Sequence, residues 1–365
     1  MTKIDLNTIS KRRSLVIGKF WPPHMGHHRM IDDASKTFDG VEAQVYIVIC
    51  ASSGQVPTGS DRARWMQAIH PRADVIVVED VCAHHHPKPC EPECTLLWAE
   101  RIQALGLGPI DLVATNEPYG PGFAAALGAQ HIFTDERRDV HPISATDVRN
   151  SLADNWLHLH PITRAGMYRR VVVLGAESTG TSTLARDLAS ALEAPLTGEA
   201  GRTVSWELFA RVGNMETVQW TDSVFWSIVE QQIRLEHDAI WTRISQAAPF
   251  VEGVGPWLVC DTDTLATVAW WERYLTTPSA ALLEFARIRL ADLYILTSPE
   301  GIDFDDSDPT RDGRFVRASM HQQFRSLLSE IGVLFIEVSG PPELRLEQAV
   351  TAIKYHEQHN PRFVH

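Results

Sequence analysis

Residues 14–31 join a short apolar run to a turn rich in proline and histidine, and this junction restricts the folds open to the chain. Residues 15–17 are typical of a buried strand, and Gly18 ends it. His24 and His27 follow two prolines and open the next helix. Open α/β sheets bind ligands beyond the carboxyl ends of their strands, and free N–H groups at a helix N-terminus attract phosphate. We therefore expect a phosphate site here; a strand–turn–helix with incidental histidines is the alternative.

The alternation of apolar runs and helical segments continues through the first half of the chain. We expect strands over residues 43–50, 74–78 and 110–114, and helices over residues 60–70, capped by Ser60, and 95–105. Continuous apolar strands are typical of a sheet that is covered on both faces. The alternation predicts an α/β fold with a parallel, doubly wound, Rossmann-like sheet.

Length, charge and cysteine content set the class of protein. A chain of 365 residues is long enough for two domains, which we place at residues 1–160 and 168–365, with a connector over residues 154–169 that keeps some helix before Pro161. The net charge of −13 argues against a broad nucleic-acid-binding face. Five cysteines, no apolar run long enough to cross a bilayer and no signal peptide predict a cytoplasmic protein with reduced thiols.

A second polar motif, Ile-Ser-Ala-Thr-Asp-Val-Arg, lies at residues 143–149. Ser144 or Thr146 can cap a helix while offering hydroxyl and N–H groups to a phosphate, and Arg149 adds positive charge. An ordinary capped helix is the alternative. Asn116 and Tyr119 follow another predicted strand at the same edge of the sheet, and they are candidate substrate contacts.

The segment from Cys82 to Cys94 combines three histidines, three cysteines and three prolines. Cys90 and Cys94, joined by histidines at 84–86, are the residue types that bind zinc. The spacing is loose, however, and the prolines favour a rigid surface loop instead. We also count Trp98, just after this loop, among the expected substrate contacts.

A second nucleotide site is expected in the other half of the chain. Residues 170–174 form a predicted strand, the loop at 175–183 follows, and a helix runs from Leu184 to about 193. The loop fits the P-loop pattern Gly-x4-Gly-Lys-Ser/Thr except that Thr181 occupies the position of the lysine. A hydroxyl cannot replace the ammonium that normally meets the β- and γ-phosphates. The backbone cradle and a hydroxyl for magnesium remain, so the expected phosphate contacts are Gly175, Ser178, Gly180, Thr181, Ser182 and Thr183.

Charged residues in three further segments favour a catalytic origin for this second site. Asp261 and Asp263 follow a strand over residues 257–260, where an acid orders magnesium, together with Ser182, or accepts a hydroxyl proton. Glu199 and Arg202 add a carboxylate and a guanidinium. Residues 308–317 place arginines, among them Arg311 and Arg317, in a polar segment suited to a lid that closes on phosphates; a solvated, charged helix start is the alternative.

The stretch Gly18-Lys-Phe-x-Pro-x-His24-x-Gly-His27 resembles the first signature of the nucleotidyltransferase superfamily, and Ile-Ser-x-Thr-x-x-Arg149 is similar to the second signature of its members that adenylylate nicotinamide mononucleotide. The resemblance spans residues 14–150, and it implies that the loop between Cys82 and Cys94 lies near the nicotinamide nucleotide and contacts substrate. It implies that ATP and nicotinamide mononucleotide, in its amidated or deamidated form, give NAD and pyrophosphate, with Mg²⁺ bridging the phosphates. The implied ATP contacts are His24, His27 and Arg149, with Lys19 as a further cation and Gly18, Phe20, Ser144 and Thr146 beside them.

Residues 170–340 resemble the ribosylnicotinamide kinase domain of the bifunctional NadR-type family. The motifs that carry this resemblance are Glu177-Ser178, Glu199-x-Gly-Arg202 and Asp261-Thr-Asp263. The implied reaction is phosphorylation of nicotinamide riboside. With Thr181, an active kinase using another cation, a weak kinase and a nucleotide-binding sensor all remain open, as does a non-enzymatic regulator that responds to NAD or ATP. Only residues 1–13 precede the first strand, so we expect no N-terminal DNA-binding domain and no nucleic-acid partner. The expected ligands are ATP, Mg²⁺ and small nicotinamide compounds; a homo-oligomer remains open.

Overall fold

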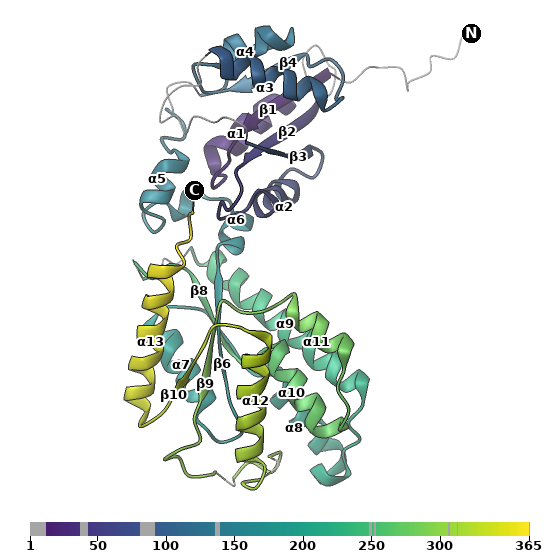
Figure 1. Ribbon diagram of the computed structural model, residues 1–365, viewed down its shortest axis with the longest axis vertical. Helices are drawn as coiled ribbons and strands as arrows, with labels where there is room; N and C mark the ends of the chain where they lie inside the picture. The colour runs from purple at the N-terminus through teal and green to yellow at the C-terminus, as the bar shows by residue number, and fades with distance from the viewer. Residues whose placement is uncertain are drawn as a thin grey trace, which may run out of the picture. The chain divides into compact units, whose positions relative to one another are not determined.

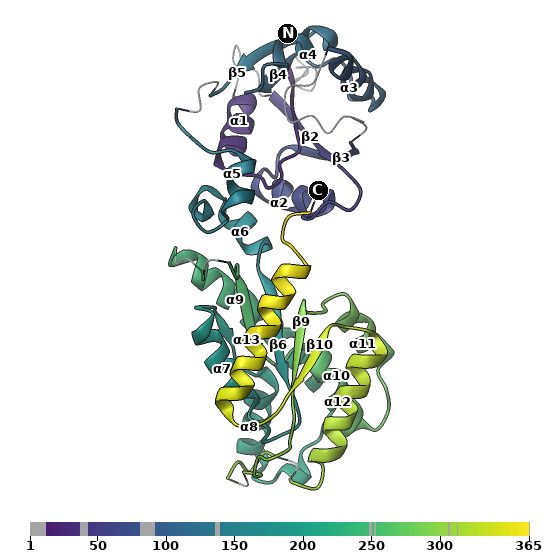
Figure 2. The same ribbon diagram turned by 60° about the vertical axis from the view of Figure 1, so that its left-hand side comes forward.

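The computed structural model describes residues 12–36, 43–80, 92–135, 139–247, 250–251, 253–305, 307–311 and 313–364. They form two compact units, each built on a parallel sheet of five strands (Figures 1 and 2). The first unit extends to Gly166 and also includes residues 362–364, and the second runs from Met167 to Pro361. The predicted α/β class, with a Rossmann-like sheet followed by a P-loop sheet, is confirmed.

The first sheet has the strand order β3-β2-β1-β4-β5, and all neighbouring strands are parallel. Its strands are β1 (Arg12–Gly18), β2 (Ala43–Ala51), β3 (Asp74–Glu79), β4 (Leu112–Thr115) and β5 (Gln130–Phe133). The chain moves outward from β1 to β3 and then returns to the other side of β1 with β4. The boundary between β1 and β4 is thus the point of topological reversal, where doubly wound sheets bind ligands.

Helices cover both faces of this sheet, as its continuous apolar strands require. Met30 and Ile31 of α1 (Met25–Ser35) and Met66 of α2 (Gly59–Ile69) pack on one face. Trp98 of α3 (Pro92–Ala104) and Phe123 of α4 (Gly120–Leu127) pack on the other. The unit is completed by α5 (Ala145–Asn150), a 3₁₀ turn at Trp156–His158 and α6 (Pro161–Gly166).

The second sheet has the order β10-β9-β6-β8-β7, with β6 at its centre. The strands are β6 (Arg169–Leu174), β7 (Leu196–Thr197), β8 (Trp257–Asp261), β9 (Leu293–Thr297) and β10 (Phe335–Val338). Residues of β6, β8 and β9 are almost completely buried. The carboxyl ends of β6 and β8, which are neighbours, therefore meet at one edge of a rigid core.

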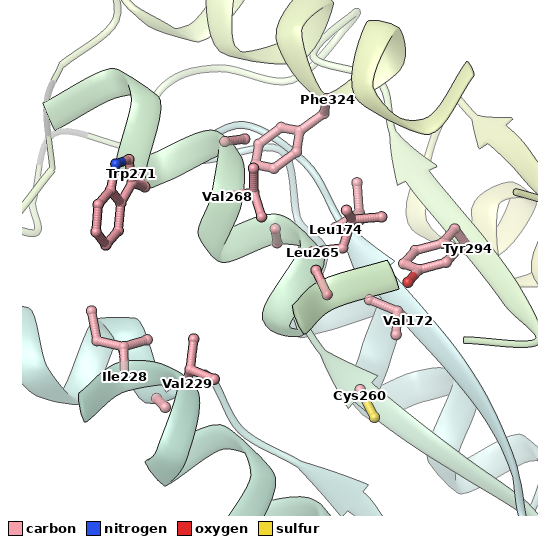
Figure 3. Packing of buried hydrophobic residues seen from close by; sticks show 14 of the residues in the cluster. Val172, Leu174, Ile228, Val229, Cys260, Leu265, Val268, Trp271, Tyr294 and Phe324 are labelled. Atoms are coloured by element: carbon pink, nitrogen blue, oxygen red, sulfur yellow. The ribbon is translucent and has the colours of Figure 1, made fainter. Parts of the chain in front are cut away.

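Two groups of helices cover this second sheet (Figure 1). One face carries α7 (Thr181–Ala191) and α13 (Pro342–His359). The opposite face carries α8 (Ala200–Val212), α9 (Asp222–Ser245), α10 (Thr264–Leu275), α11 (Ala280–Arg287) and α12 (Arg317–Ile331), with a 3₁₀ turn at Met215–Thr217. Figure 3 shows this larger core, in which Val172 and Leu174 of β6 meet Leu265 and Val268 of α10 and Phe324 of α12.

Several local expectations from the sequence are corrected by the structure. Thr58, and not Ser60, caps α2, because its hydroxyl accepts a hydrogen bond from the Asp61 N–H at 3.1 Å. The connector keeps a 3₁₀ turn at Trp156–His158 before Pro161, as expected, but it also contains α6, which begins at Pro161 because proline suits the first turn of a helix. The helix that follows the P-loop, α7, starts at Thr181, three residues before the expected start at Leu184.

The last residues also differ from the expected division of the chain. Val364 forms an antiparallel bridge with Val56, in which the Val56 N–H donates to the Val364 carbonyl at 2.9 Å and the Val364 N–H donates back at 3.1 Å. Residues 362–364 therefore belong to the first unit and not to the second, where the sequence division placed them. No helix in the described part of the chain is long and apolar enough to cross a membrane.

Candidate functional site

A cavity of about 300 Å³ opens at the point of topological reversal in the first sheet. It is lined by Ile17 and Gly18 at the end of β1 and by Thr115 and Asn116 at the end of β4. The sequence-predicted residues that line it are Gly18, Lys19, His24, His27, Asn116, Tyr119, Ser144 and Thr146. Two motifs about 120 residues apart in the sequence thus meet around one space.

The two histidines at the start of α1 are oriented by each other and by the backbone. Their ring centroids lie 3.7 Å apart, and the ring of Phe20 contacts His27 edge-on at 5.0 Å. The His24 N–H donates to Nδ1 of His27 at 3.2 Å. Because Nδ1 accepts this bond, the neutral His27 ring carries its proton on Nε2, which is then a hydrogen-bond donor.

The second motif supplies a capped helix to the same cavity. The Ser144 hydroxyl accepts a hydrogen bond from the Asp147 N–H at 3.1 Å, while the Asp147 carboxylate accepts from the Ser144 N–H at 2.8 Å. This reciprocal capping fixes Ser144, and Thr146 follows in the first turn of α5. The hydroxyls and N–H groups of this turn are therefore held at the edge of the cavity.

Arg149 lies behind the cavity wall and does not line it. Its guanidinium donates to the Trp21 carbonyl at 2.6 Å and to the Thr146 hydroxyl at 2.9 Å, and it stacks over the Trp21 ring at 4.4 Å. Burial lowers the pKa of Arg149. Arg149 thus connects the two motifs through the main chain next to Phe20 and the side chain of Thr146.

Two other predicted contacts are packed below the cavity surface. Phe20 is 1% exposed and belongs to the core under α1, and Trp98 belongs to the core under α3 and α4. Lys19 lines the cavity and forms an ion pair with Asp80 at 3.3 Å. The zinc and surface-loop alternatives concern mainly residues 82–91, which lie outside the described part of the chain, whereas Cys94 lies in α3. Among the described residues there is no group of three or more His, Cys, Asp or Glu side chains suited to a metal.

A larger cavity, of about 350 Å³, opens at the carboxyl ends of β6 and β8 in the second unit. The predicted residues that line it are Gly175, Ser178, Gly180, Thr181, Ser182, Thr183, Glu199, Arg202, Asp261 and Arg311. Gly175 is needed because a Cβ atom there would lie 2.2 Å from the Thr297 hydroxyl oxygen. Gly180 has φ = 80° and caps the N-terminus of α7, so the loop presents its backbone to the cavity.

Arginines hold the P-loop from outside the cavity. Arg345 is buried and donates to the carbonyls of Thr179 and Ser298, both at 2.9 Å. Arg317 donates to the Ser178 carbonyl at 2.8 Å but does not itself line the cavity. The Ser178 hydroxyl accepts a hydrogen bond from the Asp305 N–H at 2.7 Å. The segment that the sequence suggested as a lid is therefore hydrogen-bonded to the loop.

The carboxylates of Glu199 and Asp261 line the cavity together with the P-loop. Asp261 is 7% exposed at the end of β8, and its carboxylate accepts a hydrogen bond from the Ser182 hydroxyl. Burial raises the pKa of Asp261. Burial, followed by the nearby charge of Asp261, raises the pKa of Glu199 to about 8. Glu199 is therefore neutral at pH 7, which reduces the negative charge beside the P-loop.

Asp263 does not line the cavity; it caps the N-terminus of α10 instead. It is 1% exposed, it accepts a hydrogen bond from the Ala266 N–H that caps α10, and the Tyr294 hydroxyl donates to it at 2.9 Å. Part of the cavity lining is aromatic, since Trp220 and Tyr274 line it and stack on each other with centroids 4.4 Å apart at 20°.

Sequence reasoning missed the aromatic lining of this cavity and part of the first one. Trp220 and Tyr274 precede α9 and close α10, and no local motif marks them. In the first cavity, Met30, Asp135 and His141 were missed. Asp135 had a usable signal, because it follows β5 at the same sheet edge; its carboxylate accepts hydrogen bonds from the N–H groups of Asp139 and His141.

Fold and cavities together define a two-domain α/β nucleotide-binding architecture, with a Rossmann-like unit and a P-loop unit. The family described as "AAA domain" matches residues 170–345. The chain is 25% identical over 229 residues to the trifunctional NAD biosynthesis/regulator protein NadR of Salmonella typhimurium, and 26% identical over 226 residues to that of Escherichia coli. Each match covers 58% of this chain and 54% of the relative, so the chain spans about half the length of these relatives.

Two solved structures extend the likeness in fold over nearly the whole chain. A NadR protein in complex with NAD and AMP-PNP matches with a TM-score of 0.60 at 18% identity, covering 96% of this chain and 97% of the other. A NadR protein in complex with NR matches with a TM-score of 0.61 at 18% identity, covering 95% and 96%. The chain is thus similar to NadR proteins in sequence over 58% of its length and in fold over nearly all of it.

Proposed function

We propose that the first unit transfers AMP from ATP to nicotinamide mononucleotide, releasing pyrophosphate and giving NAD. The observation that carries this proposal is the convergence of His24, His27 and the Ser144–Thr146 turn on one cavity at the topological reversal of the sheet. Relatives whose names include NAD biosynthesis, and a similar fold solved with NAD and AMP-PNP, support the same choice of ligands.

The chemistry needs no covalent intermediate. A phosphate oxygen of the mononucleotide attacks the α-phosphorus of ATP, and the bond to the bridging oxygen breaks so that pyrophosphate leaves with the electron pair. His27 can donate from Nε2 to a phosphate oxygen, because its Nδ1 is already an acceptor. The N–H groups at the start of α1 and α5 add partial positive charge, and the positioned donors stabilise the charge that develops on the leaving group.

The test is NAD formation by the full chain with His24→Ala. We expect kcat/KM to fall by about 100-fold or more, which is the cost of removing one positioned donor to developing charge. His158→Ala is the control, since it lies in the same unit outside the cavity. Assays with the amidated and deamidated mononucleotides identify the preferred substrate. Unchanged turnover by His24→Ala, with the fold intact by circular dichroism, contradicts the site.

For the second unit we propose phosphorylation of nicotinamide riboside by ATP. Its 5′-hydroxyl oxygen attacks the γ-phosphorus, the bond from that phosphorus to the β–γ bridging oxygen breaks, ADP leaves with the electron pair, and the hydroxyl proton passes to the Asp261 carboxylate. The stacked Trp220 and Tyr274 suit a planar aromatic ring in the cavity. The oxygen donors of Ser182 and Asp261, already hydrogen-bonded to each other, fit Mg²⁺, which neutralises phosphate charge when bound.

Phosphate transfer from ATP to nicotinamide riboside, followed by ³¹P NMR, tests this second reaction. Asp261→Asn is expected to abolish product formation, while Asp238→Asn, on the exposed surface of α9, is expected to keep it. If the wild-type chain binds ATP in this cavity and forms no product, the second unit is a nucleotide sensor. If neither unit turns over, the chain is a regulator that responds to NAD or ATP, and both proposed reactions are wrong.

A further inference from the structure

The second cavity differs from an ordinary P-loop site at the first residue of α7. Thr181 lines the cavity where the pattern requires a lysine, and its hydroxyl carries no charge. Phosphoryl transfer spreads negative charge over the β- and γ-phosphates, and catalysis depends largely on cations placed around them. The remaining cations of the cavity therefore decide whether ATP can react here.

Most arginines around this cavity already have partners. Arg202 forms an ion pair with Asp308 at 2.6 Å, and Arg311 forms one with Asp305 at 3.0 Å. Arg317 and Arg345 donate to main-chain carbonyls and thereby hold the loop in shape. Moving any of these guanidinium groups onto a phosphate breaks an interaction that shapes the site.

Arg186 is different. It lines the cavity, and in the described part of the chain it makes no hydrogen bond and no ion pair. Its charge nevertheless reaches Asp261, because it is among the groups that lower the pKa of that carboxyl against the effect of burial. A guanidinium that lines a phosphate-binding cavity and has no hydrogen-bond or ion-pair partner among the described residues is available to a ligand.

Helix geometry directs the Arg186 side chain toward the P-loop. Arg186 follows Ser182 by four residues in α7, so both side chains lie on one face of the helix. Side chains in a helix tilt toward its N-terminus, and one turn spans only about 5.4 Å, a length that a long arginine side chain covers. The guanidinium is thus directed to the place where Ser182 meets Asp261.

We propose that Arg186 supplies the cation that Thr181 cannot, by hydrogen bonding to the β- and γ-phosphate oxygens of ATP. The inference rests on the proposed kinase reaction. As ADP leaves, the negative charge gathers on the oxygen that bridged the β- and γ-phosphates, and the guanidinium stabilises it. A guanidinium can bind two oxygens at once through its planar fork, whereas the ammonium of lysine acts as a point charge. The nucleotide site is therefore complete without a lysine.

The test compares Arg186→Gln with the wild type in the phosphorylation of nicotinamide riboside by the full chain. We expect kcat/KM for ATP to fall by about 100-fold, because a charged contact to the transferred phosphate is lost. Arg186→Lys should keep part of the activity. Thr181→Lys added to Arg186→Gln should recover at least about tenfold, since the charge returns at its usual position. Arg287→Gln is the control, because this exposed arginine of α11 lies outside the cavity and pairs with Glu284 on the surface.

Activity of Arg186→Gln within about threefold of the wild type would overturn the proposal, since it corresponds to well under 1 kcal/mol of transition-state stabilisation. If the wild type forms no product, the proposed kinase reaction has failed, and ATP binding decides the role of Arg186 separately. Calorimetry is then done on chains that also carry His24→Ala and His27→Ala, so that heat reports the second cavity. Arg186→Gln must weaken ATP binding at least tenfold relative to Arg287→Gln; equal affinities would refute the assignment.

Discussion

The ring of Phe363 packs edge-on against the indole of Trp21, with centroids 6.3 Å apart at an angle of 84°. Trp21 is 6% exposed, and its Nε1–H donates to the Val56 carbonyl at 2.6 Å. Val56 in turn pairs with Val364. The residues that follow α13 therefore support Trp21, which accepts a hydrogen bond from Arg149 and precedes His24 by three positions.

Replacing Phe363 by alanine should weaken the first unit and its reaction together. The loss of an aromatic pair of this kind costs about 0.5–1.5 kcal/mol beyond the buried area. We expect the free energy of unfolding of the first unit, from urea titration, to fall by that amount or more. KM for ATP in NAD formation should rise, because Trp21 and Arg149 lose a neighbour that positions them.

Tyr355→Ala is the matched control for Phe363→Ala. Tyr355 is an exposed aromatic residue of α13 that stacks on His359, with ring centroids 3.8 Å apart. Its removal should leave NAD formation unchanged. A normal KM for Phe363→Ala, in a chain of lowered stability, would limit the role of the contact to folding.

The P-loop offers a steric prediction with a glycine control. Gly175→Ala brings a methyl group to within 2.2 Å of the Thr297 hydroxyl oxygen and 2.8 Å of that of Thr179. Overpacking of this kind costs about 1–3 kcal/mol, and ATP binding in the second cavity should weaken because the loop must shift. In the control Gly198→Ala, no atom lies within 4 Å of the added carbon, so stability and ATP binding should both stay unchanged. Equal urea midpoints for the two variants would show that the loop adapts at no cost.

A third prediction concerns the pH dependence of the second unit. Burial raises the pKa of Glu199 to about 8, so the folded state keeps a proton that the unfolded chain releases near pH 4.5. Stability therefore falls as the pH rises from 4.5 to 8, and the full cost is present above pH 8. Glu199→Gln stays neutral, and the difference between its melting temperature and that of the wild type should grow by at least about 2 °C from pH 5 to pH 9.

Calorimetry of the full chain, following the transition of the second unit, measures this effect. Glu284→Gln changes an exposed carboxylate of α11 and should track the wild type at both pH values. Parallel behaviour of Glu199→Gln and the wild type from pH 5 to pH 9 would mean that Glu199 is ionised in the folded chain.

The two candidate phosphate-binding segments could be located from sequence because their pattern is local. A strand, a glycine and the start of a helix lie within 20 residues in each case, and backbone geometry alone brings them to a sheet edge. The aromatic lining of the second cavity could not be found in this way. Trp220 and Tyr274 are far apart in the sequence, and only the packing of α9 against α10 brings them together.

Arg149 shows a second limit of sequence reasoning. The motif correctly located this residue one turn into a helix near the cavity, but a guanidinium has several possible acceptors. In the structure it donates to the Trp21 carbonyl, a main-chain atom whose position depends on the turn after β1. The contacts of Phe363 with Trp21 and of Val364 with Val56 could not be predicted from sequence either. They join residues that lie far apart in the chain, and no local motif marks them as partners.

The final prediction concerns a buried histidine cluster next to the first cavity. His28 of α1 is 4% exposed, and its Nδ1 lies 3.0 Å from Nε2 of His70 at the end of α2. The His160 ring centroid lies 5.5 Å away, and Asp32 approaches His70 at 3.7 Å. Burial, followed by the charges of His70, His160 and His24, lowers the pKa of His28 to about 3.

His28 is thus neutral in the folded chain, whereas in the unfolded chain it takes up a proton near pH 6.5. Its contribution to stability is complete above pH 6.5 and is lost as the pH falls toward 3, by about 1.4 kcal/mol per pH unit. His28→Asn keeps a hydrogen-bonding side chain toward His70 and cannot ionise. Between pH 7.5 and pH 5.0, the free energy of unfolding of the first unit should fall by about 2 kcal/mol less in this variant than in the wild type. Urea titration at the two pH values measures this difference. His158→Asn is the control, because His158 lies outside the cluster, and its free energy of unfolding should fall as much as that of the wild type. If the free energy of unfolding of His28→Asn also falls by the wild-type amount, other groups cause the acid sensitivity.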